Sequence, residues 1–229
     1  MKKRFLAALA TGLLVVGMGG VAQAVMFSFS DIEVNPSIPN LSTQLFVDVT
    51  DGGSGLINFT FSNTSVIQSS ITDIYFDFPP ADPEIADVPF MSYVGMSDSD
   101  GAGTGVLFDL DASPPNVPGW NEVDPDFAVS FDSDSGAQGV GAVAAGINAA
   151  SEWLTISFNA IGGYNFNSIL AAMNSGAFRI ALHVQGITTA DYSDGYINNP
   201  NPVPEPATML LFGTGLAGLA GIARRRKKS

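Results

Sequence analysis

Residues 45–61 read Leu-Phe-Val-Asp-Val-Thr-Asp-Gly-Gly-Ser-Gly-Leu-Ile-Asn-Phe-Thr-Phe. This stretch holds two short segments in which apolar residues occupy every second position. This period of two is typical of β-strands that have one buried face and one polar face. The residues between the segments, 51–55, are rich in glycine and suit a tight connection between neighbouring strands. The stretch therefore predicts a β-hairpin of two antiparallel strands.

The same alternation recurs along the chain and predicts a protein made mainly of strands. Segments with this period are 74–78, 154–158 and 178–184, and shorter strands are expected near 26–29, 88–94, 106–111 and 127–131. Because one side of each segment is polar, we expect antiparallel sheets with one face in solvent. Regular strands with little helix favour an all-β fold, an antiparallel β-sandwich of which a jelly roll is one form.

One short helix is expected near residue 170. Ile169, Leu170 and Met173 have the spacing of one helical face. Asn167 is the expected N-cap of this helix, and Gly176 is the residue expected to end it.

The N-terminus has the three parts of a secretory signal peptide. Residues 2–4 are basic, residues 5–21 are apolar and mostly small, and Ala22 and Ala24 form an A-x-A cleavage site. We therefore predict that residues 1–24 are removed and that the mature chain begins directly after them, on the far side of the inner membrane.

The C-terminal end also has three parts, each with its own physical role. Residues 203–206 read Val-Pro-Glu-Pro, and the prolines fix the backbone in an extended form. Residues 207–223 are apolar and reach the lower limit of length for a transmembrane helix. The basic residues of 224–229 resist crossing the membrane, so this end is expected to stay in the cytoplasm. Proline at every second position predicts that residues 198–206 form a semi-rigid polyproline II stalk.

Together these parts resemble the PEP-CTERM sorting signal of Gram-negative bacteria that make exopolysaccharide. The resemblance covers about residues 203–228 and implies recognition and cleavage by an exosortase, an integral-membrane processing enzyme. It implies that the recognition box is Val203, Pro204, Glu205 and Pro206. It also implies a transient inner-membrane intermediate, then a structural, biofilm-associated role at the cell surface or in the exopolysaccharide matrix. An ordinary C-terminal anchor that is never cut is the alternative.

The domain between the two signals, residues 25–197, is strongly acidic. Of the nine basic residues in the chain, three lie at 2–4 and five at 224–228, which leaves Arg179. Only Glu205 of the 22 acidic residues lies after this domain. We therefore expect no nucleic-acid partner and no direct adhesion to acidic polysaccharide, because both need positive charge. The chain has no cysteine, so core burial rather than disulfides must stabilise it.

Acidic loops make calcium a candidate ligand, because calcium takes oxygen ligands from carboxylates. The candidate ligands are Asp98, Asp100, Asp109, Asp111, Asp132 and Asp134. Their spacing is a poor match to an EF-hand loop, because a third acidic ligand is missing. The alternative is an ordinary solvated loop that helps solubility. No other cofactor is expected.

Three further residues are candidate ligand contacts. Arg179 and His183 share the polar side of one expected strand, either as a pair for a small carboxylate or sugar or as two solvated residues. Trp153 adds an aromatic surface to a carbohydrate-binding face that also includes His183. The function expected first is a non-enzymatic structural or matrix protein. The alternatives are a carbohydrate- or calcium-binding module and a glycoside-active enzyme that uses two carboxylates.

Overall fold

The computed structural model describes residues 24–32, 35–78, 90–100, 105–112, 117, 127–136, 141–188 and 192–200. Antiparallel strands dominate this part of the chain. They are β1 (Ala24–Asp31), β2 (Leu45–Gly53), β3 (Leu56–Asn63), β4 (Ser70–Asp77), β5 (Met91–Asp98), β6 (Phe108–Leu110), β7 (Phe131–Ser135), β8 (Trp153–Ala160), β9 (Arg179–Ile187) and β10 (Tyr192–Asn198). Two helices, α2 (Ala142–Ala145) and α3 (Phe166–Ser175), complete the described elements.

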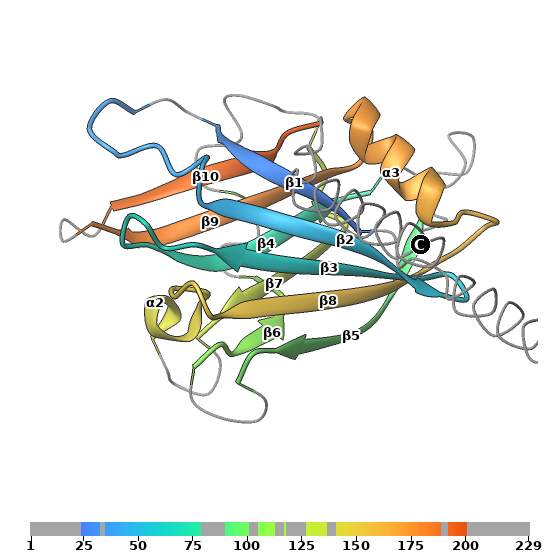
Figure 1. The fold of residues 1–229 in the computed structure, drawn as a ribbon, viewed down its shortest axis with the longest axis horizontal. Helices are drawn as coiled ribbons and strands as arrows, with labels where there is room; N and C mark the ends of the chain where they lie inside the picture. The colour runs from blue at the N-terminus through green and yellow to red at the C-terminus, as the bar shows by residue number, and fades with distance from the viewer. Residues whose placement is uncertain are drawn as a thin grey trace, which may run out of the picture.

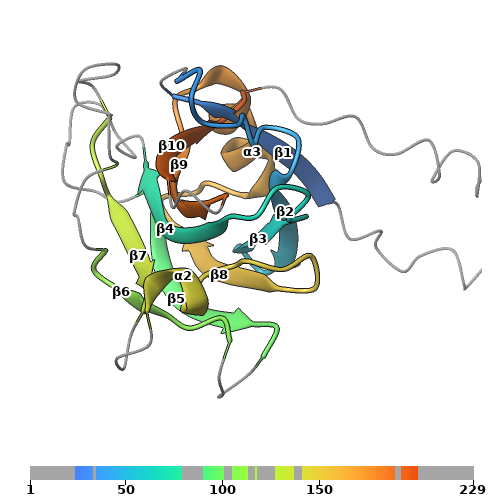
Figure 2. The same cartoon turned by 90° about the vertical axis from the view of Figure 1, so that its left-hand side faces the viewer.

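The strands form one curled sheet in the order β5-β8-β3-β2-β1-β10-β9-β4-β7-β6 (Figure 1). β1 pairs with β2 through its first residues and with β10 through its last, so the sheet folds over at this strand. We call β5, β8, β3, β2 and β1 the β3 half, and β10, β9, β4, β7 and β6 the β4 half. The sheet curls so that the two halves lie on opposite sides of the domain interior (Figure 2), and residues of both halves share one core there. The predicted mainly all-β, antiparallel fold is therefore confirmed, with one curled sheet supplying both layers.

The hairpin expected from the sequence is present as β2 and β3. Val47 pairs with Phe61, and both side chains are fully buried. In the connection between the strands, Gly53 and Gly55 have φ angles of 80° and 85°. A residue with a Cβ is strained at such angles, which explains why this turn is rich in glycine.

Phenylalanine rings fill the space between the two halves. Phe59 on β3 lies 5.4 Å from Phe76 on β4, with an angle of 81° between the rings. Phe158 on β8 lies 5.2 Å from the same Phe76 ring. Contacts of this geometry stabilise the core beyond the effect of burial alone. Phe76 therefore packs the β4 half on the β3 half, and Phe78 and Phe131 add further contacts of this kind to Phe158.

The prediction of one solvated face is wrong for β4. All eight of its residues are buried. A second, smaller apolar cluster covers the outer side of the strand, and in it Tyr75 and Ala181 pack with Ala112 and Val117. The residues that cover the strand come from distant positions in the chain, which the alternation within the strand cannot reveal.

β10 is a strand that the sequence pattern did not predict. Its residues, Tyr-Ser-Asp-Gly-Tyr-Ile-Asn, lack a regular alternation of apolar side chains. The strand forms because its backbone pairs with β9 on one side and β1 on the other, while Tyr196 is fully buried. β5 and β7 begin three and four residues later than expected, respectively, because backbone pairing sets their bounds.

The N-cap of α3 lies two residues before the expected position. Asn165, rather than Asn167, caps the helix, since its Oδ1 accepts a hydrogen bond from the Ser168 backbone N–H at 3.2 Å. Gly176 ends the helix as expected, with a left-handed φ of 76°. The apolar face of the helix packs into the main core through Phe166, Ile169, Leu170 and Met173.

Replacing Asn165 with alanine is expected to lower the free energy of unfolding by about 1 kcal/mol, the usual effect of a lost N-cap. Asn167→Ala is the matched control. Asn167 is exposed and lies inside the helix, where alanine is the better helix former, so this variant should be neutral or slightly stabilised. Urea unfolding of the purified variants measures both changes. Equal losses for the two variants would contradict the assignment of the cap.

The targeting segments expected from the sequence lie outside the described residues. These are residues 1–23, and residues 201–229 with most of the stalk, the apolar segment and the basic end. Ala22 falls in the first of them, whereas Ala24 is exposed at the first position of β1. Across the part of the chain that the structure describes, no helix combines the length and apolar character needed to cross a membrane.

Candidate functional site

Four polar residues form a row across the outer face of the β4 half. The strand register pairs Asp109 of β6 with Asp134 of β7, and Asp134 with Asp73 of β4. Asp73 in turn is paired with His183 of β9. The topology thus brings three candidate residues from separate segments together. Asp73, which the sequence did not single out, joins the acids to the histidine.

His183 and Asp73 form a buried, hydrogen-bonded pair. The Nδ1 of His183 lies 2.8 Å from the Oδ2 of Asp73, and the two residues are 6% and 2% exposed. The Thr72 hydroxyl donates to the same Asp73 oxygen at 2.7 Å. Because burial of either group without a partner would be unfavourable, the pair fastens β4 to β9. His183 is therefore buried, and the interpretation of it as a solvated residue is wrong.

Arg179 is paired on the same face. Its Nε donates to the Asp77 Oδ2 at 3.0 Å, and its guanidinium carbon lies 5.3 Å from the centre of the Phe127 ring. The side chains of Arg179 and Asp77 are 18% and 11% exposed. Arg179 and His183 thus each contact their own carboxylate on β4, and they do not form one binding pair.

Tyr75 lies between these two side-chain contacts along β4 and is fully buried. Burial, and then the negative charges of Asp73, Asp132 and Asp134, raise the pKa of its hydroxyl far above the ordinary value. The phenol therefore stays protonated at physiological pH and supplies no anionic nucleophile. Along β4, the outer face of this half is therefore a covered layer that supports the fold.

The calcium candidates are not gathered into one site. The Asp98 Oδ1 accepts the Asp100 backbone N–H at 2.9 Å, and the Asp100 Oδ2 accepts the Val106 N–H at 2.8 Å. Similarly, the Asp132 Oδ1 accepts the Ala112 N–H at 3.0 Å. These carboxylates therefore bind nearby backbone groups. Among the described residues, no group of three or more acidic, histidine or cysteine side chains is placed to hold a metal ion.

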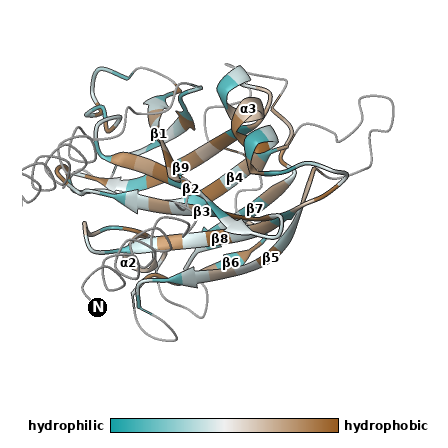
Figure 3. Cartoon of the chain, turned by 45° about the vertical axis from the view of Figure 1, so that its right-hand side comes forward, coloured by the Kyte–Doolittle hydropathy of each residue, from teal (hydrophilic) through white to brown (hydrophobic). Residues whose placement is uncertain are grey.

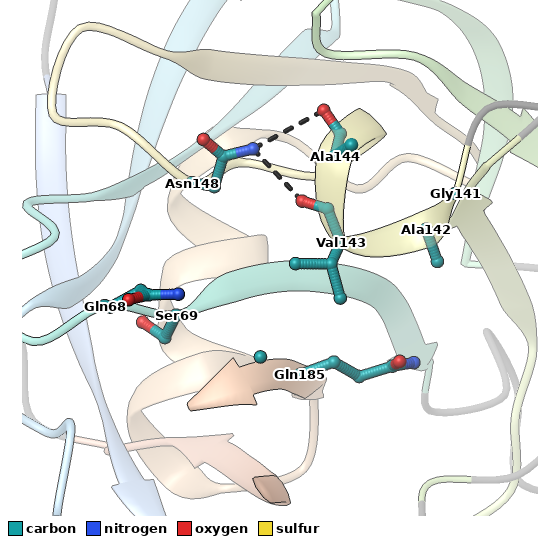
Figure 4. A pocket seen from close by; sticks show the side chains of 9 residues that line it. Gln68, Ser69, Gly141, Ala142, Val143, Ala144, Asn148 and Gln185 are labelled. Atoms are coloured by element: carbon teal, nitrogen blue, oxygen red, sulfur yellow. Dashed lines mark hydrogen bonds between the residues drawn. The ribbon is translucent and has the colours of Figure 1, made fainter. Parts of the chain in front are cut away.

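An open pocket of about 710 Å³ lies between α2 and the neighbouring ends of two strands, the residues just before β4 and the last residues of β9 (Figure 4). Its lining consists of amide, hydroxyl, methyl and glycine groups, from Gln68, Ser69, Gly141, Ala142, Val143, Ala144, Asn148, Gln185 and Gly186. The Asn148 Nδ2 donates to the carbonyl oxygens of Val143 and Ala144 at 3.1 and 3.5 Å, which fixes the short helix that forms one wall. The walls of this pocket come from three separate segments, so no local pattern in the sequence indicates it.

The outer face of the β3 half differs in charge from the rest of the domain. We define the neutral face as its outward-pointing residues on β1, β2, β3 and β8: Met26, Ser28, Phe46, Asp48, Thr50, Leu56, Asn58, Thr60, Ser62, Trp153, Thr155, Ser157 and Asn159. They alternate with buried apolar residues, as the bands of hydropathy along β8 show (Figure 3). Asp48 is the one charged residue in this set, and partial burial raises the pKa of its carboxyl.

Side chains of the neutral face are linked across the strands. The hydroxyl oxygens of Thr60 and Thr155 lie 2.8 Å apart, and the Ser157 hydroxyl donates to the Asn58 Oδ1 at 2.8 Å. Trp153 is 37% exposed at one end of the face. This face therefore combines an ordered set of uncharged polar groups with an accessible aromatic ring.

Trp153 and His183 do not share a binding face, contrary to the expectation from the sequence. Trp153 points outward from the β3 half, and His183 points outward from the β4 half. Because the common core lies between the two halves, the outer faces point in opposite directions. The alternation along each strand correctly predicted that both side chains point outward. It could not predict where the two strands lie relative to each other.

The all-β domain is followed by a proline-rich segment, an apolar segment and a basic end. This order is typical of an exported protein that is sorted through a signal at its C-terminus. Residues 202–227 match the PEP-CTERM protein-sorting motif. The match confirms the resemblance of the C-terminal end. Such a motif implies export and recognition by exosortase, a membrane processing enzyme, with localisation at the surface. No curated protein and no solved structure matches the chain.

Proposed function

We propose that this chain is a non-enzymatic structural protein of the extracellular matrix in a Gram-negative bacterium, where it associates with exopolysaccharide in biofilm. The observation that carries this proposal is the sorting motif at residues 202–227. After cleavage within this motif, the acidic β-domain would leave its membrane intermediate and be displayed outside the cell. The strongly negative domain would stay soluble and resist nonspecific adhesion to polyanions.

The charged groups of the described domain favour a structural role over a hydrolytic one. A glycosidase needs two carboxyl groups that face each other across a substrate site. Asp73 and Asp77, the buried carboxylates among the described residues, bind His183 and Arg179. They therefore contribute to strand association in the fold that we propose is displayed.

The sorting step predicts a specific loss of mass. Intact-mass analysis of the native extracellular protein should show a C-terminus within or next to Val203–Pro206, without the apolar and basic segments that follow. Replacing Pro204 and Glu205 with alanine should keep the full-length chain in the membrane fraction, because the recognition box is lost. Pro200→Ala is the matched control, since it alters a proline just outside the box and should be processed normally.

A second experiment tests the enzyme rather than the motif. Cells that lack exosortase should accumulate the uncut chain in the inner membrane and display little of it. If such cells release and display the protein at the normal level, the chain is not sorted through this enzyme. Recovery of the full-length tail in normal cells would instead identify a permanent anchor.

A further inference from the structure

We propose that the neutral face of the β3 half binds an uncharged polysaccharide chain. The inference deepens the proposed function by naming the chemistry of the matrix partner, and its biological meaning rests on display outside the cell. The binding itself does not depend on sorting. The charge, the aromatic residues and the hydrogen-bonding groups of this one surface support it.

The neutral face differs in charge from the acidic domain that carries it. The domain between the two signals has 21 acidic residues and one basic residue, a formal charge of about −20. The neutral face includes 13 outward residues on four strands, of which only Asp48 is charged. A polyanion would be repelled by the domain as a whole, and a second copy of the chain would carry the same charge. An uncharged polymer is the partner that matches this surface.

Two aromatic side chains of the neutral face lie in one row across the strands. Phe46 on β2 pairs with Ser62 on β3, which in turn pairs with Trp153 on β8. Phe46 and Trp153 therefore lie in one row, two strand spacings apart, or about 10 Å. This separation is comparable with the length of a disaccharide. The C–H faces of pyranose rings are apolar and can stack on aromatic rings, so two sugars of one chain can contact the row.

Hydroxyl and amide groups that can form hydrogen bonds lie between and beside the two rings. Hydroxyl groups both donate and accept, as sugar hydroxyls do, and those of Thr60 and Thr155 lie 2.8 Å apart. The Ser157 hydroxyl is ordered by its hydrogen bond to Asn58. Short side chains on paired strands lose little conformational entropy when a ligand binds. The face is thus an ordered surface of polar side chains on paired strands.

Affinity electrophoresis of the full chain, purified in detergent, tests the proposal. The probes are the uncharged polysaccharides dextran, hydroxyethylcellulose and galactomannan, with alginate as the anionic probe. We expect at least one uncharged probe to retard the protein and alginate not to. Trp153→Ala should weaken that binding about tenfold or more, because truncation of an accessible tryptophan in a contact surface has effects of this size. Phe46→Ala should weaken it as well.

Two matched controls separate the neutral face from other surfaces. Tyr192→Ala removes an aromatic residue of the β4 half that is 39% exposed, close to the 37% of Trp153. Gln185→Ala alters the pocket next to α2. Both variants should bind like the unaltered protein, and all four variants should keep its thermal unfolding temperature within a few degrees.

Each outcome bears on the proposal directly. Retardation by an uncharged probe that Trp153→Ala weakens about tenfold or more, and that both controls retain, supports it, whereas unchanged binding of the Trp153→Ala variant contradicts it. No retardation by any uncharged probe, preferential binding of alginate, or loss of binding only in the Gln185 or Tyr192 variant overturns it. None of these results depends on processing of the C-terminus, so failure of the binding proposal and failure of the sorting proposal are distinguishable.

Discussion

Replacing Phe76 with alanine is expected to lower the free energy of unfolding by about 3–5 kcal/mol, the range typical of a buried phenylalanine. The side chain is fully buried. Its ring contacts six others, those of Phe59, Phe61, Phe78, Phe131, Phe158 and Phe178. Removing it takes away apolar burial and leaves a cavity where the two halves of the sheet meet, and the neighbouring rings cannot all move to fill it.

Urea unfolding of the purified protein, followed by tryptophan fluorescence, measures this effect. Tyr192→Ala is the control, because Tyr192 is 39% exposed and its loss should change the free energy of unfolding by less than about 1 kcal/mol. A Phe76→Ala variant as stable as this control would show that the ring cluster does not hold the two halves together.

Replacing Asp73 with alanine is expected to lower the free energy of unfolding by about 3–5 kcal/mol, because it removes one partner of a buried pair. The Nδ1 of His183 and the hydroxyl of Thr72 both lose the carboxylate oxygen that they contact at 2.8 and 2.7 Å. The histidine would then remain buried beside a cavity, without its acidic partner. The loss should therefore exceed that expected from the removed volume alone.

A double substitution tests whether the loss comes from the unpaired polar group that remains. The double variant with Asp73→Leu and His183→Leu should recover a large part of the stability that Asp73→Ala loses, since two apolar side chains leave no polar group unpaired. Asp109→Ala is the control, because Asp109 belongs to the same row but is exposed on β6. If Asp73→Ala is no more destabilising than Asp109→Ala, the pair is not a structural contact.

Local patterns in the sequence predicted those parts of the fold that depend on one strand at a time. The alternation in residues 45–61 identified β2 and β3 and the inward side of each, and Gly176 was correctly expected to end α3. The polar side of residues 178–184 was also assigned correctly, since His183 does point away from the main core. Its burial was missed because the cover is supplied by other segments.

The candidate site was less predictable, because its geometry depends on which strands become neighbours. Asp73 shows this well: within its own segment it is one of several acidic residues, and only pairing of β4 with β9 places it against His183. In the same way, the neutral face becomes visible only when β1, β2, β3 and β8 lie side by side. No single one of these strands is unusual in charge.

The sequence by itself determined the C-terminal sorting motif, the acidic character of the exported domain and its construction from antiparallel strands. These properties depend on residue type and on spacing within short segments, where backbone geometry and solvation act locally. The tertiary structure alone decided that His183 is buried and that Arg179 is partly buried beside Asp77. It also decided that Trp153 lies on the opposite face and that uncharged residues of separate strands lie side by side on the β3 half. The physical reason is that burial and proximity depend on contacts between distant segments, and these exist only once the sheet has curled and its strands have paired.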